Sequence, residues 1–121
     1  MKHILLVTSQ ENNFAEFIGG LTREETVEIV QAASSEEALG GLSTTIPDLV
    51  NIDEEVNGTP GLKIARTILM KNAMLNQALV SRLSSEEFHE ASEGLGIMAQ
   101  LPPEPDAAHA KTLLDTLKKM P

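Results

Sequence analysis

The 121-residue sequence contains no cysteine, tryptophan or tyrosine, and aromatic residues make up only 2% of it. Without cysteine the chain has no disulfides, no thiolate metal ligands and no cysteine nucleophile. This composition is compatible with a reducing compartment, so we expect a cytoplasmic protein. Because aromatic side chains are so few, aliphatic residues must fill the core. Met70, Met74 and Met98 are expected to fill gaps there, the alternative being a binding surface.

Basic residues are also scarce, with nine Lys and Arg against eighteen Asp and Glu and a net charge of −9. Nucleic-acid binding depends first on cations that neutralise phosphates, so the chain is not expected to bind DNA or RNA. The same acidity disfavours anionic membranes. The apolar run at residues 4–7 is too short for a signal peptide or a membrane-spanning helix, and we expect neither.

The apolar pattern predicts five short strands that alternate with five helices. The strands are expected at residues 4–7, 27–33, 48–52, 78–81 and 97–99. Apolar residues at three- and four-residue steps place a helix after each strand, the last one beginning at about Asp106. Short apolar strands joined by helices favour a parallel sheet covered on both faces. Residues 1–121 are therefore predicted to form a single domain.

Polar residues mark the ends of several predicted elements. Ser34 with Glu37 three residues later predicts a reciprocal capping box, and Ser84 or Ser85 is expected to cap the fourth helix. Residues 57–61 (NGTPG) are expected to form a turn-rich loop. Asn51 lies in an otherwise apolar strand, so its amide needs partners, and Thr8 or Ser9 on the first strand are the candidates.

The segment 47–53 (PDLVNID) ends a predicted strand in an aspartate, and Gly61-Leu62 follows eight residues later. Together with residues 35–39 (SEEAL), Gly94 and Pro102, this order and spacing resembles the receiver domains of two-component response regulators. The resemblance covers essentially the whole chain. It implies a flavodoxin-like (βα)5 fold, a doubly wound five-stranded parallel sheet of order 2-1-3-4-5 with helices on both faces.

The resemblance also assigns roles to positions in this sequence. Asp53 occupies the phosphoacceptor position, and Ser81 matches the hydroxyl that closes on the phosphoryl group. Receivers typically carry two adjacent acids after the first strand, where this chain has Thr8 and Ser9, and a lysine where it has Leu101. The degenerate pocket is thus expected to contain, beside Asp53, the residues Thr8, Ser9, Ser81, Leu101 and Pro102.

The missing acids and lysine have a physical consequence. At about 4 Å and an effective dielectric of about 20, a carboxylate attracts a divalent ion by roughly 8 kcal/mol before desolvation. The hydroxyls of Thr8 and Ser9 supply none of that charge, so no metal site and no cofactor are expected. An incoming phosphoryl group is expected to meet the acids Asp53, Glu54 and Glu55 and no cation. We therefore predict that Asp53 is not efficiently phosphorylated.

Structural roles compete with these functional ones. Asp53 is a candidate for hydrogen bonding in a turn, and Ser81 for satisfying local backbone groups. Glu54 and Glu55 are expected at a solvated loop edge, the alternative being that Glu55 points into the pocket and partly replaces a lost acid.

The function expected from these residues is that of a pseudo-receiver, a phosphorylation-independent signalling module that binds a signalling protein and catalyses nothing. The docking face is expected on the fourth helix, fifth strand and last helix, or on the first helix, and the chain is expected to be a monomer or weak homodimer. One alternative is a working receiver in a two-component phosphorelay, with Asp53 as phosphoacceptor and Glu54 or Glu55 completing a magnesium site. The other is a small-molecule-binding domain, its crevice lined by uncharged residues such as Thr8, Ser9, Ser81 and Leu101.

Overall fold

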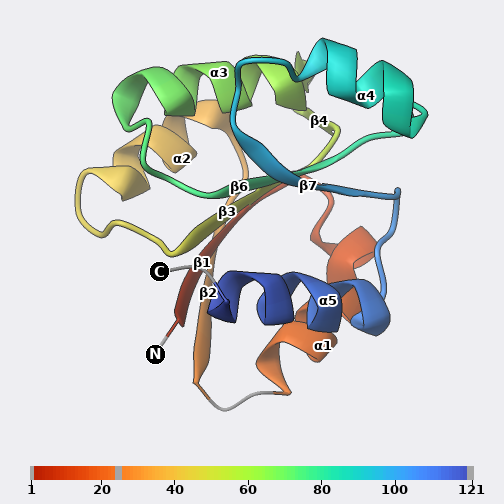
Figure 1. Ribbon diagram of the computed structural model, residues 1–121. Coiled ribbons are helices and arrows are strands. Elements are labelled where there is room, and N and C mark those ends of the chain that lie inside the picture. The colour runs from red at the N-terminus through yellow and green to blue at the C-terminus, as the bar shows by residue number, and fades with distance from the viewer. Residues whose placement is uncertain (1, 24–25, 120–121) are drawn as a thin grey trace.

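The computed structural model describes residues 2–23 and 26–119 (Figure 1). Five parallel strands form its central sheet in the order β2-β1-β3-β6-β7. They are β1 (Lys2–Val7), β2 (Val27–Ala32), β3 (Leu49–Ile52), β6 (Gln77–Val80) and β7 (Ile97–Leu101). Counting only the strands of this sheet, the order is 2-1-3-4-5, so the predicted topology is confirmed.

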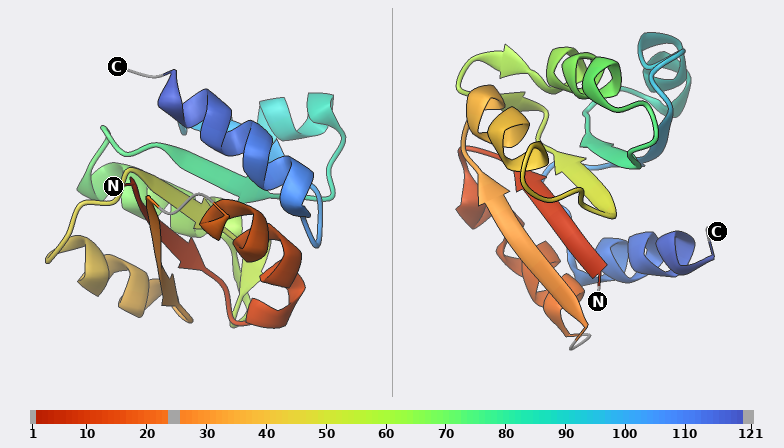
Figure 2. Two further views of the ribbon diagram at one scale, coloured as in Figure 1. Left: turned by 90° about the horizontal axis from the view of Figure 1, so that it is seen from below. Right: turned by 90° about the vertical axis from the view of Figure 1, so that its left-hand side faces the viewer.

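Helices cover both faces of the sheet (Figures 1 and 2). One face carries α2 (Ser35–Leu42), α3 (Gly61–Lys71) and α4 (Ser85–Ala91), and the other carries α1 (Ala15–Thr22) and α5 (Ala107–Lys118). A 3-10 turn, η1 (Glu11–Phe14), leads into α1. The flavodoxin-like doubly wound fold expected from the sequence is therefore confirmed. Among the described residues, no helix combines the length and apolarity needed to cross a membrane.

Two apolar clusters form the core, one on each face of the sheet. Strand residues alternate between them: Val50 and Ile52 pack toward α2, α3 and α4, whereas Leu49 packs toward α1 and α5. Aliphatic side chains dominate both clusters, as the composition predicts. The methionine prediction is confirmed for Met98, which is half-buried and packs against the cluster facing α1 and α5. It is wrong for Met70 and Met74, which are 83% and 88% exposed.

A small hairpin, β4 (Glu55–Val56) and β5 (Thr59–Pro60), replaces the loop predicted between β3 and α3. Asn57 and Gly58 at its tip have φ angles of 50° and 83°. An Asn-Gly pair readily adopts two positive φ angles and therefore favours a tight hairpin turn. The two-residue strands are too short to show apolar alternation in the sequence. Strand β7 also extends past the predicted residue 99, since its pairing with β6 continues to Leu101.

Side-chain caps begin three helices. Ser84 and Glu87 form the full capping box of α4, and Asp106 caps α5. The pKa of Asp106 is lowered, chiefly because its carboxylate accepts a hydrogen bond from the backbone N–H of His109. At α2 the predicted box is only half right. Ser34 accepts from the Glu37 N–H, but the Glu37 carboxylate accepts from the N–H of Ala33 at 2.6 Å, one residue before the cap.

Asn51 is fully buried in β3, and neither its amide nitrogen nor its amide oxygen has a partner among the described residues. The predicted bonds to Thr8 or Ser9 are therefore wrong. Asn51 pairs in register with Leu6 and Ala78, whose apolar side chains lie in the cluster facing α1 and α5. The Thr8 hydroxyl donates elsewhere, to Asp53.

Helices α1 and α5 pack closely at Gly20, where an added Cβ would lie 2.7 Å from the Cα of Ala107 and 2.9 Å from the Cβ of Ala110. We expect Gly20→Ala to lower the free energy of unfolding by about 1–3 kcal/mol, because the helices must move apart. A Cβ on the neighbouring Gly19 meets nothing within 4 Å. Gly19→Ala should therefore stabilise α1 by about 0.5–1 kcal/mol. Urea denaturation of both variants measures the difference, and equal effects would contradict this packing.

The unpartnered amide of Asn51 yields a second stability prediction. Replacing it with an apolar side chain of similar size removes two buried polar atoms without partners. We expect Asn51→Leu to raise the free energy of unfolding by about 1–3 kcal/mol, measured by urea denaturation. A loss of stability would show instead that the amide is satisfied in solution.

Candidate functional site

The carboxyl ends of the central strands meet at one edge of the sheet, where Thr8 follows β1, Asp53 follows β3 and Ser81 follows β6. In open α/β sheets this edge is the usual place for a functional crevice. A cavity of about 270 Å³ lies there. Its lining consists of Asn13, Phe14, Asp53, Glu54, Val80, Arg82, Pro103 and Glu104.

Both carboxylate oxygens of Asp53 accept hydrogen bonds from the protein. The Thr8 hydroxyl donates to Oδ2 at 2.7 Å, and the Glu54 backbone N–H donates to Oδ1 at 2.7 Å. The Thr8 hydroxyl oxygen in turn accepts from the N–H of Gln10 at 2.9 Å. Thr8 is completely buried and Asp53 is half-buried. The carboxylate is thus held between the ends of β1 and β3 by two short bonds, in a turn-stabilising arrangement.

The other residues expected in the pocket are dispersed. Leu101 is 4% exposed and belongs to the apolar cluster facing α1 and α5. Ser81 accepts a hydrogen bond from the Leu83 N–H at 3.2 Å, a local backbone interaction. Ser81 and Pro102 line a neighbouring cavity of about 430 Å³, and Ser9 lines neither of the two cavities. Of the residues expected in the pocket, Thr8 thus contacts Asp53, Ser81 and Pro102 line the neighbouring cavity, and Leu101 lies in the core.

Arg82 lines both cavities, which corrects the expectation that no cation lies here. Its backbone N–H donates to Glu54 Oε2 at 2.6 Å, and its Nε lies 3.4 Å from Glu54 Oε1. The guanidinium is already paired with an acid of the same cavity. The sequence contained a signal for Arg82, because this residue lies two positions after the end of β6, at the same edge of the sheet as Asp53.

The two candidate accessory acids lie in different places. Glu54 lines the cavity and binds Arg82, whereas Glu55 is exposed on β4 and is not part of the cavity lining.

Gly61 explains how the chain turns back so close to Asp53. A Cβ at Gly61 would collide with the backbone oxygen of Asp53, and the Gly61 N–H donates to the Glu54 carbonyl at 2.7 Å.

The donor set at Asp53 does not fit a magnesium ion, which the resemblance implies for receivers. Magnesium prefers several hard oxygen ligands, mainly carboxylates and water. At β1 the chain offers hydroxyls, and that of Thr8 already donates to Asp53 and accepts from Gln10. Within residues 2–23 and 26–119, no group of three or more His, Cys, Asp or Glu residues is arranged to hold a metal ion.

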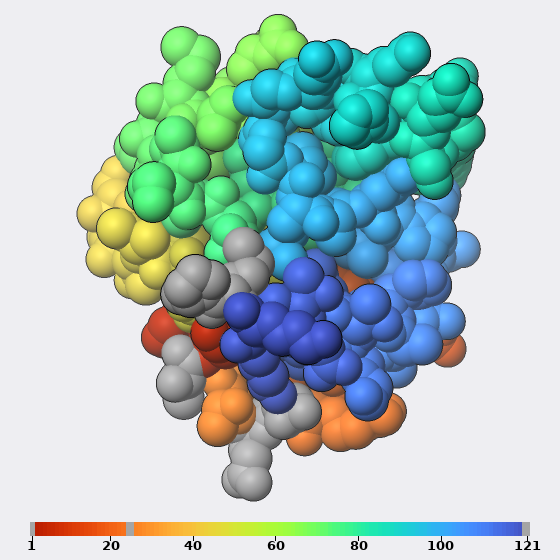
Figure 3. All heavy atoms as spheres, in the orientation of Figure 1, coloured from red at the N-terminus to blue at the C-terminus, as the bar shows by residue number. Residues whose placement is uncertain are grey.

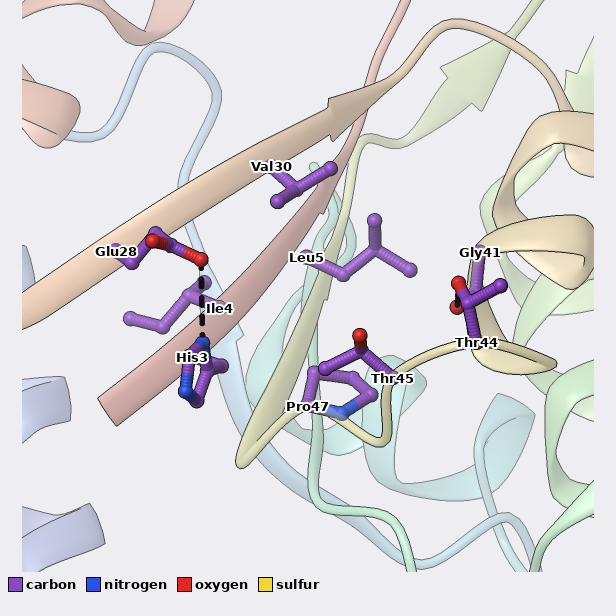
Figure 4. A pocket seen from close by; sticks show the side chains of 9 residues that line it. All are labelled: His3, Ile4, Leu5, Glu28, Val30, Gly41, Thr44, Thr45 and Pro47. Carbon is purple, nitrogen blue, oxygen red and sulfur yellow. Dashed lines mark hydrogen bonds and ion pairs between the residues drawn. The ribbon is translucent and has the colours of Figure 1, made fainter. Parts of the chain in front are cut away.

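A separate cavity of about 140 Å³ opens at the opposite, amino end of the strands (Figure 4). It lies between the starts of β1 and β2 and the C-terminal end of α2, and its lining includes Leu5, Val30, Gly41 and Pro47. His3 and Glu28, which are paired in register on β1 and β2, lie together on one side of it with 3.3 Å between Nδ1 and Oε1. This mainly apolar recess shares no lining residue with the Asp53 cavity.

The bond from Thr8 to Asp53 can be tested by a double-mutant cycle. We expect Thr8→Val to lower the free energy of unfolding by about 1.5–3 kcal/mol, because a half-buried carboxylate loses its hydroxyl donor. In an Asp53→Ala background the same substitution should cost much less, since the acceptor is gone. Thr112→Val on α5 is the control, because the Thr112 hydroxyl donates to a helix carbonyl at an exposed position. Additive effects of Thr8→Val and Asp53→Ala would exclude the interaction.

No model of a protein family matches the sequence, and no curated protein matches it. Solved structures do match. A CheY-like response regulator receiver domain from Methanospirillum hungatei JF-1 superimposes with a TM-score of 0.81 at 18% identity, over 98% of this chain and 95% of that one.

Two further structures give the same result. The chemotaxis response regulator CheY4 of Vibrio cholerae has a TM-score of 0.82 at 15% identity, with 97% and 98% of the two chains covered. The response regulator TrrA from Thermotoga maritima, solved in complex with Mg²⁺ and BeF, has a TM-score of 0.76 at 27% identity, with 97% and 99% covered. As the sequence resemblance predicts, the chain has the fold of response regulator receiver domains.

Proposed function

We propose that this chain is a receiver-like signalling module that acts by binding a signalling protein and does not depend on phosphorylation. The observation that carries the proposal is the hydrogen bond of 2.7 Å from Thr8 to Asp53. At the position where receivers typically carry an acid, this chain has a hydroxyl that donates to the aspartate. The phosphoacceptor-equivalent side chain is thereby used as a structural acceptor.

The charge around Asp53 supports the proposal. The cavity contains three carboxylates, Asp53, Glu54 and Glu104, and one guanidinium, that of Arg82. Because Arg82 already pairs with Glu54, an incoming phosphoryl group meets unbalanced negative charge. Phosphoryl transfer depends on positioning and on neutralising charge as the reaction proceeds, so these residues disfavour it. Binding is therefore the activity that we propose.

Arg82 also provides the one observation that favours the alternative, a working phosphoacceptor. If Glu54 released it, the guanidinium would be a cation beside Asp53 in the same cavity. Arg82 would then neutralise the phosphoryl group during phosphorylation of Asp53, in place of a metal ion held by acids after β1. The two functions make opposite predictions for a single chemical experiment.

We expect no covalent phosphoryl adduct on the protein after incubation with acetyl phosphate and magnesium, because neither a metal site nor a free cation neutralises the reagent. Intact-mass spectrometry provides the measurement. An adduct on the unmodified chain that disappears in Asp53→Asn would overturn the proposal. If Arg82 were responsible, the adduct would also disappear in Arg82→Ala.

A gain-of-function variant serves as the matched positive control. Thr8→Asp with Ser9→Asp restores the two acids that receivers typically carry, and we expect it to gain magnesium binding by calorimetry. Since Thr8 is completely buried, circular dichroism must first show that the variant is folded. Ser9→Asp alone changes a half-buried residue and is the milder variant.

A further inference from the structure

Helix α3 carries a charge opposite to that of the rest of the chain. Between Glu55 and Glu86 the sequence has four basic residues and no acidic one, although the whole chain has a net charge of −9. Three of these four bases, Lys63, Arg66 and Lys71, lie on α3. The helix is therefore a local cationic element on an acidic protein.

The cationic residues gather on the solvent side of the helix. Lys63, Arg66 and Met70 follow one another at three- and four-residue steps, so they share one face, and all three are exposed. The opposite face of α3 is buried against the sheet. Within the described residues the side chains of Lys63 and Arg66 take part in no ion pair and no hydrogen bond.

Two exposed methionines lie at the C-terminal end of this helix and just after it. Met70 is 83% exposed, and Met74, just after the helix, is 88% exposed. The Met74 N–H donates to Asn72 Oδ1 at 3.0 Å, which stabilises the turn that presents Met74. In the space-filling view, the green atoms of α3 and of the segment after it form the upper left of the surface (Figure 3). Flexible, polarisable methionine side chains are well suited to binding surfaces.

We propose that the α3 face, defined as Lys63, Arg66, Met70 and Met74, binds an acidic segment of a protein partner that also carries apolar side chains. The inference rests on the proposed function, namely that the chain works by binding a protein. Unpaired cations attract and orient carboxylates, and the methionines contribute apolar surface to bury. The α3 face differs from the docking faces expected from the sequence, which involve the first, fourth and last helices.

Other occupants fit this face less well. The acidic helix α4 of a second copy would be complementary to it, because a two-fold dimer can pair each α3 with the α4 of the other copy. Each copy carries a net charge of −9, however, which opposes self-association. An anionic membrane would be repelled by that same overall charge. A segment of a different, acidic protein can adopt whichever orientation matches the four residues of the α3 face.

The test uses a fluorescein-labelled synthetic helical peptide with a row of Glu beside a row of Leu, and a matched peptide in which Lys replaces every Glu. Fluorescence anisotropy at low salt should show binding of the acidic peptide only. Lys63→Glu with Arg66→Glu should weaken it at least about tenfold. Met70→Ser with Met74→Ser should weaken it about fivefold. Lys111→Glu, an exposed charge reversal on α5, should leave it unchanged.

Equal binding of the two peptides, or equal effects of the α3 and α5 charge reversals, would overturn the inference. Co-sedimentation of the protein with phosphatidylserine vesicles that Lys63→Glu abolishes would also overturn it, because the face would then bind a membrane. Self-association in light scattering that the same variant abolishes would assign the face to a second copy instead. Asp53→Asn should not alter peptide binding. Phosphorylation of Asp53 would therefore refute the proposed function while leaving this result intact.

Discussion

The hydrogen bond between Thr8 and Asp53 is the interaction on which the rest of the site depends. It connects the ends of β1 and β3, and it occupies Oδ2 of the carboxylate. The second carboxylate oxygen accepts the Glu54 N–H, which directs Glu54 toward Arg82. A chain of contacts thus runs from β1 through Asp53 to the segment after β6. Each of these hydrogen bonds positions the group that makes the next one, so together they hold this edge of the sheet.

Charge is distributed unevenly over the molecule, and this organises its possible interactions. Acids lie around the Asp53 cavity and in the first turns of α2 and α4, where they also favour the positive ends of the helix dipoles. The bases of α3 face solvent on the same side of the sheet. A partner approaching this side meets two surfaces of opposite sign, which favours one binding orientation over others.

The packing of the two faces differs in how much change it tolerates. On the face of α1 and α5, Gly20 permits a helix contact that any larger residue would disrupt, and the aromatic pair Phe14 and Phe17 meets edge to face at 6.1 Å. Asn51 is buried on this same face without a partner, and its apolar neighbours do not offset the desolvation cost of its amide. The exposed side chains of α3, among them Lys63, Arg66 and Met70, carry no comparable packing constraint.

The sequence by itself determined the five main strands, the helices between them and the position of Asp53 at the end of β3. These follow from local apolar periodicity, from caps such as Ser84 and Asp106, and from the convergence of parallel strand ends. Only the tertiary structure decided which side chains meet. It placed Leu101 in the core, gave the Thr8 hydroxyl to Asp53 instead of Asn51, and brought Arg82 to Glu54. Such pairings join residues 28 to 45 positions apart, and no local pattern encodes the direction in which a side chain points once the strands are assembled.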